Sequence, residues 1–231
     1  MNPGTAALVR GLDVLVALAE PDAARDGLGV SRLADVVGAD KSQVSRTLQA
    51  LDEHGFVTRD PDTLAYRLGW QVHALAALAG DAALLDAARP VLAALVAELG
   101  ESAHLSVRRG DQVLTLLSES PPVAIHAPAR VGGLTPLATT SAGRVLAIGL
   151  DDAELDRLGV DPQPVRRAEA DGFAIVREEF EPGLVAVAAP VRDAAGRVVA
   201  AVNVSAPSFR FGDRLEAAAP VVLAAARGLG G

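Results

Sequence analysis

Residues 30–51 constrain the fold of this chain most strongly. Their apolar side chains recur at helical spacing, first on a short segment and then on a longer one: Leu33, Val37, Val44, Leu48 and Leu51. Gly38 stands between the two segments, at a turn position that larger residues tolerate poorly, and Ala34 keeps the crossing point small. The pattern predicts two helices that share an apolar core, a helix-turn-helix.

The second predicted helix has a marked start and a polar outer surface. Asp40 is placed to cap it, and Gln43 completes the pattern of a capping box. Its outward positions are Lys41, Ser42, Gln43, Ser45, Arg46 and Gln49. Arg and Lys suit the acceptors of guanine, Gln suits adenine, and Ser suits phosphates. These residues are candidate DNA contacts, and the alternative interpretation is an ordinary solvated helix face.

A predicted hairpin follows this helix. Residues 56–59 and 64–68 have the pattern of two short strands flanking Asp60-Pro61-Asp62-Thr63, and Gly69 closes the unit. Arg59 and Arg67 lie near the tip, within reach of a DNA backbone or minor groove. A helix-turn-helix followed by such a wing is far more specific than either part alone. The combination predicts binding to double-stranded DNA.

The charge balance argues against a strongly electrostatic DNA-binding mode. The chain has a net charge of −8, and residues 1–69 hold seven Lys and Arg against ten Asp and Glu. DNA-binding domains are usually basic. Binding must therefore depend on where the few cations lie, and we expect a low nonspecific affinity.

The rest of the chain predicts helices packed on an antiparallel sheet. A helix over residues 6–20 is expected, then a loop over 22–29, and a helical stretch over 70–100 interrupted at Gly80 and Pro90. Beyond it we expect strands at 103–107, 113–117, 185–191 and 198–204, and helices at 141–149, 153–158 and 214–227. This succession indicates an α+β domain.

Several short motifs resemble those of the IclR family of bacterial transcriptional regulators. In the first part they are Val9-Arg10-Gly11-Leu12, Leu48-Gln49-Ala50-Leu51 with Gly55-Phe56-Val57, and Tyr66-Arg67-Leu68-Gly69. In the second part they are Val131-Gly132-Gly133, Pro136-Leu137-Ala138-Thr139 with Gly143-Arg144, Glu178-Glu179 with Gly183, and Ala188-Ala189-Pro190-Val191 with Gly196. The resemblance implies a winged helix-turn-helix DNA-binding domain over residues 1–69, a linker helix over 70–80, and a GAF-like effector-binding domain over 81–231.

In that family the effector pocket lies between the sheet and the loop and helix after the Pro-Leu motif, and it often takes small organic or aromatic acids. Here Thr139, Thr140 and Ser141 precede a predicted helix whose first N–H groups, through Ala142 and Gly143, lack partners and suit a carboxylate. The alternative is that these hydroxyls only cap the helix.

The hairpin around Asp193-Ala194-Ala195-Gly196 supplies the facing wall of the expected pocket. A four-residue loop pairs Arg192 with Arg197, which sets Ala186 opposite Asn203 and Leu184 opposite Ser205, all on one face. The family often has a cysteine at position 186, an acidic residue where Val176 stands and a serine at 203. The sequence therefore predicts a less polar pocket and an acid with an apolar body, unless Asn203 lies on an exposed strand face.

Other classes find less support in the sequence. The chain has no cysteine, which excludes disulfides and thiolate chemistry, and its four histidines lie in no metal-binding spacing, so we expect no catalytic residue, metal or cofactor. The alternatives are an enzyme or a ligand-binding module that acts without DNA.

No stretch long enough to span a membrane occurs, so a soluble cytoplasmic protein is expected. We also expect a homodimer or a dimer of dimers, joined through the N-terminal helix and residues 70–79, on near-palindromic operator DNA.

Overall fold

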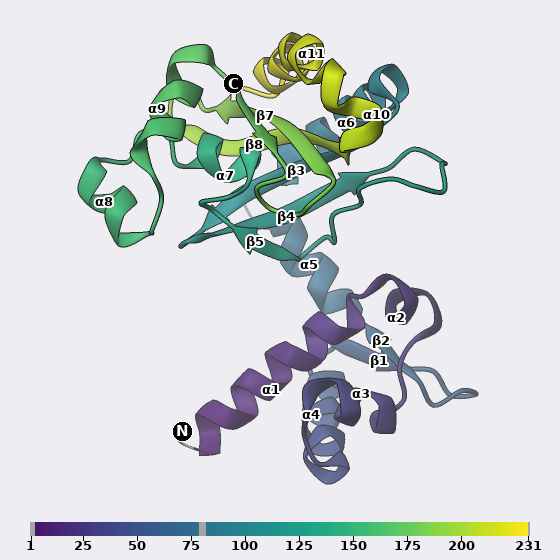
Figure 1. Cartoon of the computed structure of the whole chain (residues 1–231). Coiled ribbons are helices and arrows are strands. Elements are labelled where there is room, and N and C mark those ends of the chain that lie inside the picture. Colours follow the sequence, from purple (N-terminus) through teal and green to yellow (C-terminus); the bar gives the residue numbers. More distant parts are fainter. Residues whose placement is uncertain (1–2, 79–81, 231) are drawn as a thin grey trace. The chain divides into compact units, whose positions relative to one another are not determined.

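The computed structural model describes residues 3–78 and 82–230. They belong to two compact units, residues 1–82 and residues 83–231, and each unit is described by itself (Figure 1). Helices in the described ranges are all too short or too polar to cross a lipid bilayer.

The first unit is built around the predicted helix-turn-helix. Its elements are α1 (Pro3–Leu18), α2 (Pro21–Asp26), α3 (Val30–Val37), α4 (Lys41–Glu53), β1 (Val57–Arg59), β2 (Tyr66–Leu68) and α5 (Trp70–Leu78). Leu33, Val44 and Leu48 are fully buried against Val14 and Leu18 of α1. Gly38 ends α3 with φ 64°, the left-handed conformation that favours glycine, so the predicted turn is confirmed.

Two local predictions in this unit are wrong. The expected loop over 22–29 contains α2, because Pro21 occupies the first helical turn, where its fixed φ and missing N–H are tolerated. The expected capping box does not form. Asp40 precedes α4 without accepting from its backbone N–H groups, and its carboxylate instead accepts from the Gln43 side-chain amide at 3.5 Å.

The described part of the second unit forms a six-stranded antiparallel sheet in the order β5-β4-β3-β8-β7-β6. The strands are β3 (Ser102–Arg109), β4 (Gln112–Glu119), β5 (Leu134–Pro136), β6 (Ala174–Arg177), β7 (Leu184–Arg192) and β8 (Val198–Pro207). The helices are α6 (Ala82–Leu99), α7 (Ser141–Leu146), α8 (Asp152–Arg157), α9 (Pro162–Asp171), α10 (Ser208–Phe211) and α11 (Leu215–Gly228), with a 3-10 turn at Gly212–Arg214.

The sheet separates two apolar cores (Figure 1). On one face, alternate residues such as Val187, Val202 and Leu105 pack with α6 and α11. On the other, Ala188 and Ala201 pack with α7 and α9. Because strand side chains alternate between faces, their neighbours Asn203 and Ser205 also face the side of the sheet that α7 covers.

Helix α6 runs through Pro90, so the predicted interruption there is wrong. Proline costs a helix one backbone hydrogen bond, and Pro90 lies on the exposed side of α6, whose inner face is held by Ala88, Leu92 and Leu95. The predicted interruption at Gly80 lies outside the described residues. The sequence interpretation also missed α9, β5, β6 and α10.

The β7–β8 hairpin has the predicted face but not the predicted register. Ala186 pairs with Ser205 and Ala188 with Asn203, two residues away from the expected partners. One residue of the shift arises because the loop closes between Asp193 and Arg197, and the other arises from a bulge beside Arg192. A shift of two preserves the face, since side chains repeat every second residue.

Candidate functional site

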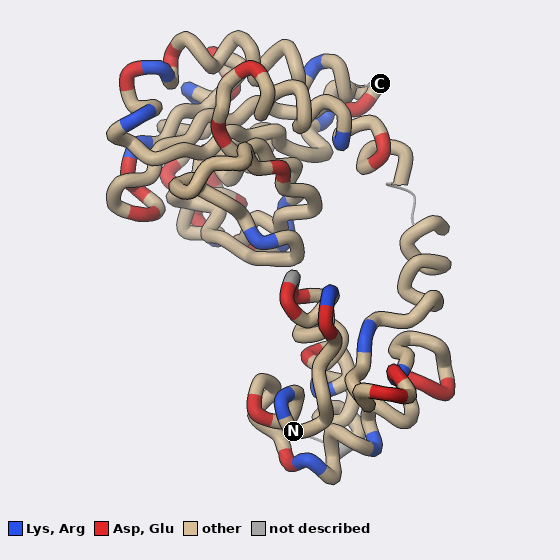
Figure 2. The backbone as a smooth tube through the Cα atoms, turned by 90° about the vertical axis from the view of Figure 1, so that its right-hand side faces the viewer, with Lys and Arg blue, Asp and Glu red and all other residues tan. Residues whose placement is uncertain are grey.

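The polar surface of α4 lies opposite its buried side. Val44 and Leu48 are fully buried, whereas the side chains of Lys41, Ser42, Ser45, Arg46 and Gln49 are exposed and Gln43 is half-buried. Gln49 donates to the Glu53 carboxylate at 3.1 Å. Basic and acidic positions are interspersed along the first unit (Figure 2), so the attraction of an anionic partner would depend on a few placed cations.

The predicted wing holds its two arginines differently. Arg59 is exposed, lies 5.5 Å from the Tyr66 ring centre and donates to the Leu64 carbonyl at 3.5 Å. Arg67 is half-buried, and its buried Nε has no hydrogen-bond partner among the residues that the structure describes. Asp60 fixes the tip by accepting from the N–H groups of residues 62 and 63, and these bonds hold its pKa below its ordinary value. Arg59 is thus the more accessible cation of the wing.

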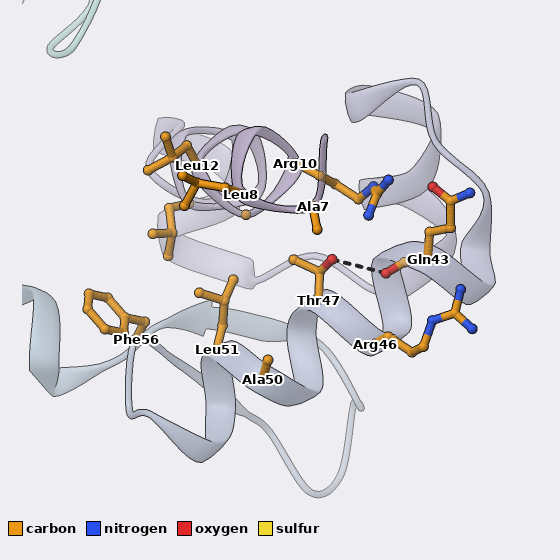
Figure 3. A pocket seen from close by; sticks show the side chains of 12 residues that line it. Ala7, Leu8, Arg10, Leu12, Gln43, Arg46, Thr47, Ala50, Leu51 and Phe56 are labelled. Atoms are coloured by element: carbon orange, nitrogen blue, oxygen red, sulfur yellow. Dashed lines mark hydrogen bonds between the residues drawn. The ribbon is translucent and has the colours of Figure 1, made fainter. Parts of the chain in front are cut away.

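Arg10 is a cation that the sequence interpretation did not assign to the site. It lies on α1 and lines a groove of about 650 Å³ between α1 and α4. Figure 3 shows it extending toward Gln43, beyond Thr47, whose hydroxyl donates to the Gln43 carbonyl at 3.0 Å. The periodicity of α1 alone could not reveal this neighbourhood, because it depends on how α1 crosses α4.

A cluster of polar side chains, buried except for the half-buried Ser118, covers part of the α7 face of the sheet. The His104 ring joins Ser118 Oγ through Nδ1 at 3.0 Å and Ser205 Oγ through Nε2 at 2.8 Å. Ser205 also donates to the Ala127 carbonyl at 3.2 Å, and Asn203 pairs directly with His104 across β3 and β8. Burial lowers the pKa of His104 to about 4, so the ring is neutral at pH 7.

This cluster contains two of the predicted effector residues, Asn203 and Ser205, each 8% exposed, so Asn203 does not lie on an exposed face. Ala186 pairs with Ser205 on one side and with Val176 on the other. Positions 176 and 186, where the resemblance leads one to expect polar residues, therefore lie side by side in the sheet. His104 and Ser118 were missed. The signal for His104 was the alternation of polar and apolar residues along the start of β3, where both faces are buried.

The start of α7 is capped by the side chain of Thr140, the residue just before the helix. Thr140 Oγ1 accepts from the Gly143 N–H at 3.1 Å and donates to the Pro136 carbonyl at 2.9 Å. The prediction that Gly143 offers a free N–H to a ligand is therefore wrong, and the capping role holds for Thr140. Ser141 and Ala142 are buried and Thr139 is half-buried.

Comparison with known proteins places both units in one family. The family model described as "IclR helix-turn-helix domain" matches residues 7–61, and the model described as "Bacterial transcriptional regulator IclR C-terminal" matches residues 76–230. The HTH-type transcriptional regulator BhcR of Paracoccus denitrificans is 31% identical, over 98% of this chain and 86% of that protein. The Pca regulon regulatory protein of Pseudomonas putida is 30% identical, over 96% and 82% respectively.

The same architecture occurs in solved structures. An IclR homolog from Microbacterium hydrocarbonoxydans, complexed with 4-hydroxybenzoate, matches this chain with a TM-score of 0.77. The match covers 96% of this chain and 97% of that one. At 24% identity this similarity concerns the fold.

Proposed function

Because the chain belongs to the IclR family of bacterial transcriptional regulators, we propose that it binds a near-palindromic operator through α4 and the wing, under the control of a small-molecule effector. Its relatives are regulators rather than enzymes. We assign DNA binding to residues 1–69, the linking role to 70–80 and effector binding to 81–231.

The observation that carries the DNA-binding proposal is the exposed polar surface of α4. Helix α4 buries Val44 and Leu48 on one side and presents Arg46, Gln43 and Lys41 on the other. These three side chains carry hydrogen-bond donors that suit the acceptors on base edges in a major groove. Arg59 on the wing and Arg10 on α1 add cations for phosphate contacts.

Replacing Arg46 with alanine should weaken binding to the operator by about 1–3 kcal/mol, or about 5- to 150-fold, because one bidentate base contact is lost. Fluorescence anisotropy with labelled duplex measures it. Arg25→Ala is the matched control, since it removes the same charge from an exposed side chain that pairs with Asp26 on α2. Equal affinities of the wild type and Arg46→Ala would contradict the proposed docking.

We further propose that the protein acts as a homodimer or a dimer of dimers. Helix α5 contains no charged residue, and its side chains Trp70 and Leu78 are 84% and 86% exposed. On α1, the exposed side chains of Leu8, Leu12 and Val16 recur at every fourth position and form a stripe along the helix. Exposed apolar surface on two helices of the first unit favours association with a second copy.

The effector that fits the second unit best is a small acid with an apolar body. Ser205 and Asn203 supply a hydroxyl and an amide donor for a carboxylate, while Ala186 and Val176 leave an apolar wall where a polar ligand would need partners. Ser141 and Ala142 at the start of α7 contribute backbone N–H groups, and Thr139 and Thr140 frame the turn before them. Gly143 supports the turn.

Calorimetry with 4-hydroxybenzoate and its methyl ester tests the acid class, because the two probes share the ring and differ in the charge. The acid should bind at least tenfold more tightly, since an ionised acceptor makes the stronger hydrogen bonds. Ala186→Leu, which fills the apolar wall, should abolish binding of the acid without altering operator affinity. Equal binding of acid and ester would mean that the carboxylate is not the anchor.

A further inference from the structure

The hydrogen bonds around Ser205 have only one consistent direction. The Ala127 carbonyl can only accept, so the single hydroxyl proton of Ser205 is donated to it. Ser205 Oγ must then accept from His104 Nε2, which is 2.8 Å away. A neutral imidazole carries one N–H, so Nδ1 is an acceptor and receives the hydrogen bond that the Ser118 hydroxyl donates. The result is a directed chain from β4 through β3 and β8 to Ala127.

Ala127 belongs to the connection between β4 and β5, residues 120–133, and this connection is also held on both sides of Ala127. Arg210 on α10 donates to the Ile125 carbonyl at 3.0 Å, while the same guanidinium makes bonds of 2.6 and 2.7 Å to the buried Glu101 carboxylate. The Gly132 N–H donates to the Thr115 carbonyl at 2.8 Å. The bond from Ser205 to Ala127 therefore fixes the segment between two anchored ends.

We propose that Ser205 is a switch, whose one proton either holds residues 126–131 against the sheet through Ala127 or is donated to the acid group of the effector, which releases that segment. This inference rests on the effector class proposed above. A carboxylate accepts a hydrogen bond more strongly than a neutral carbonyl does, so the Ser205 hydroxyl donates to the carboxylate when the effector binds. His104 is a positioning residue, because its Nε2–H donates to Ser205 Oγ and the Ser205 hydroxyl proton must then point away from the ring.

Hydrogen exchange of the full-length protein without ligand tests the latch. In Ser205→Ala, the Gly132 amide, whose N–H donates to the Thr115 carbonyl at the end of this segment, should exchange about 2- to 10-fold faster than in the wild type, the effect expected of one lost hydrogen bond. Ser205→Thr keeps the hydroxyl and should restore the wild-type rate. Ser106→Ala is the matched control, since it removes another buried hydroxyl, on β3, from the same face of the sheet. Unchanged exchange in Ser205→Ala overturns the proposal.

The ring of His104 gives a second readout that a purely structural role does not move. Nitrogen NMR should show the Nε2–H tautomer in the wild type, and this preference should weaken in Ser205→Ala. A wild-type ring protonated on Nδ1 overturns the proposal, because the chain would then run in the opposite direction.

The ligand arm uses 4-hydroxybenzoate at a concentration that calorimetry shows to be saturating. The Gly132 amide should then exchange as fast in the wild type as in Ser205→Ala, and the variant should show no further increase. Binding without release overturns the switch and leaves the proposed function intact. Absence of binding excludes 4-hydroxybenzoate as the effector, and the latch is then decided by the exchange and tautomer measurements without ligand.

Discussion

Gly143→Ala should destabilise the second unit by about 3 kcal/mol. A Cβ at this position would lie 2.0 Å from the carbonyl oxygen of Leu137 and 2.6 Å from its carbonyl carbon. The obstacle is backbone, and the Leu137 side chain is fully buried, so the turn before α7 cannot yield without disturbing the core. The midpoint of thermal unfolding of this unit should fall by roughly 10 °C.

Gly228→Ala is the matched control for this substitution. A Cβ at position 228 would meet no atom within 4 Å, and the position lies in α11 of the same unit. Alanine favours helices over glycine, so this variant should be at least as stable as the wild type. If Gly143→Ala unfolds at the wild-type temperature, the close packing of α7 on Leu137 is wrong.

The stability of the second unit should fall steeply as the pH drops from 6.5 to 4, because of His104. The pKa of the buried ring is about 4, against an ordinary value of 6.5, so over this interval the unfolded chain binds a proton that the folded protein does not. The contribution is complete above pH 6.5, is lost progressively toward pH 4 and is constant below it. The difference in pKa corresponds to a loss of about 3 kcal/mol.

Urea unfolding at several pH values, in the wild type and in His104→Gln, measures this loss. Glutamine keeps a side-chain N–H donor but does not titrate, so the difference between the two curves isolates His104 from the carboxylates and from the three other histidines. The wild type should lose about 3 kcal/mol more than the variant between pH 6.5 and 4. Parallel curves would show that the ring is hydrated in the folded state.

Much of the first unit was predictable because its signals are local. The apolar spacing of α3 and α4, the glycine at the turn and the Pro-Asp tip of the hairpin each act within a few residues, so periodicity and turn chemistry were sufficient. The capping box failed because Asp40 and Gln43 bond to each other rather than to the backbone, a choice among side-chain geometries that the residue pattern leaves open.

The effector side shows where the local signals end. The alternation of residues along β7 and β8 assigned Ala186, Asn203 and Ser205 to one face correctly, since a side-chain period of two survives a shift of two residues. Their actual partners depend on a bulge and on the loop closure at Asp193, and the bond between His104 and Ser205 joins strands about a hundred residues apart in the chain. Such contacts are set by the order of strands in the sheet, because each element's own pattern is compatible with several neighbours. The sequence thus specifies the helix-turn-helix and the strand faces, and the sheet order creates the polar cluster.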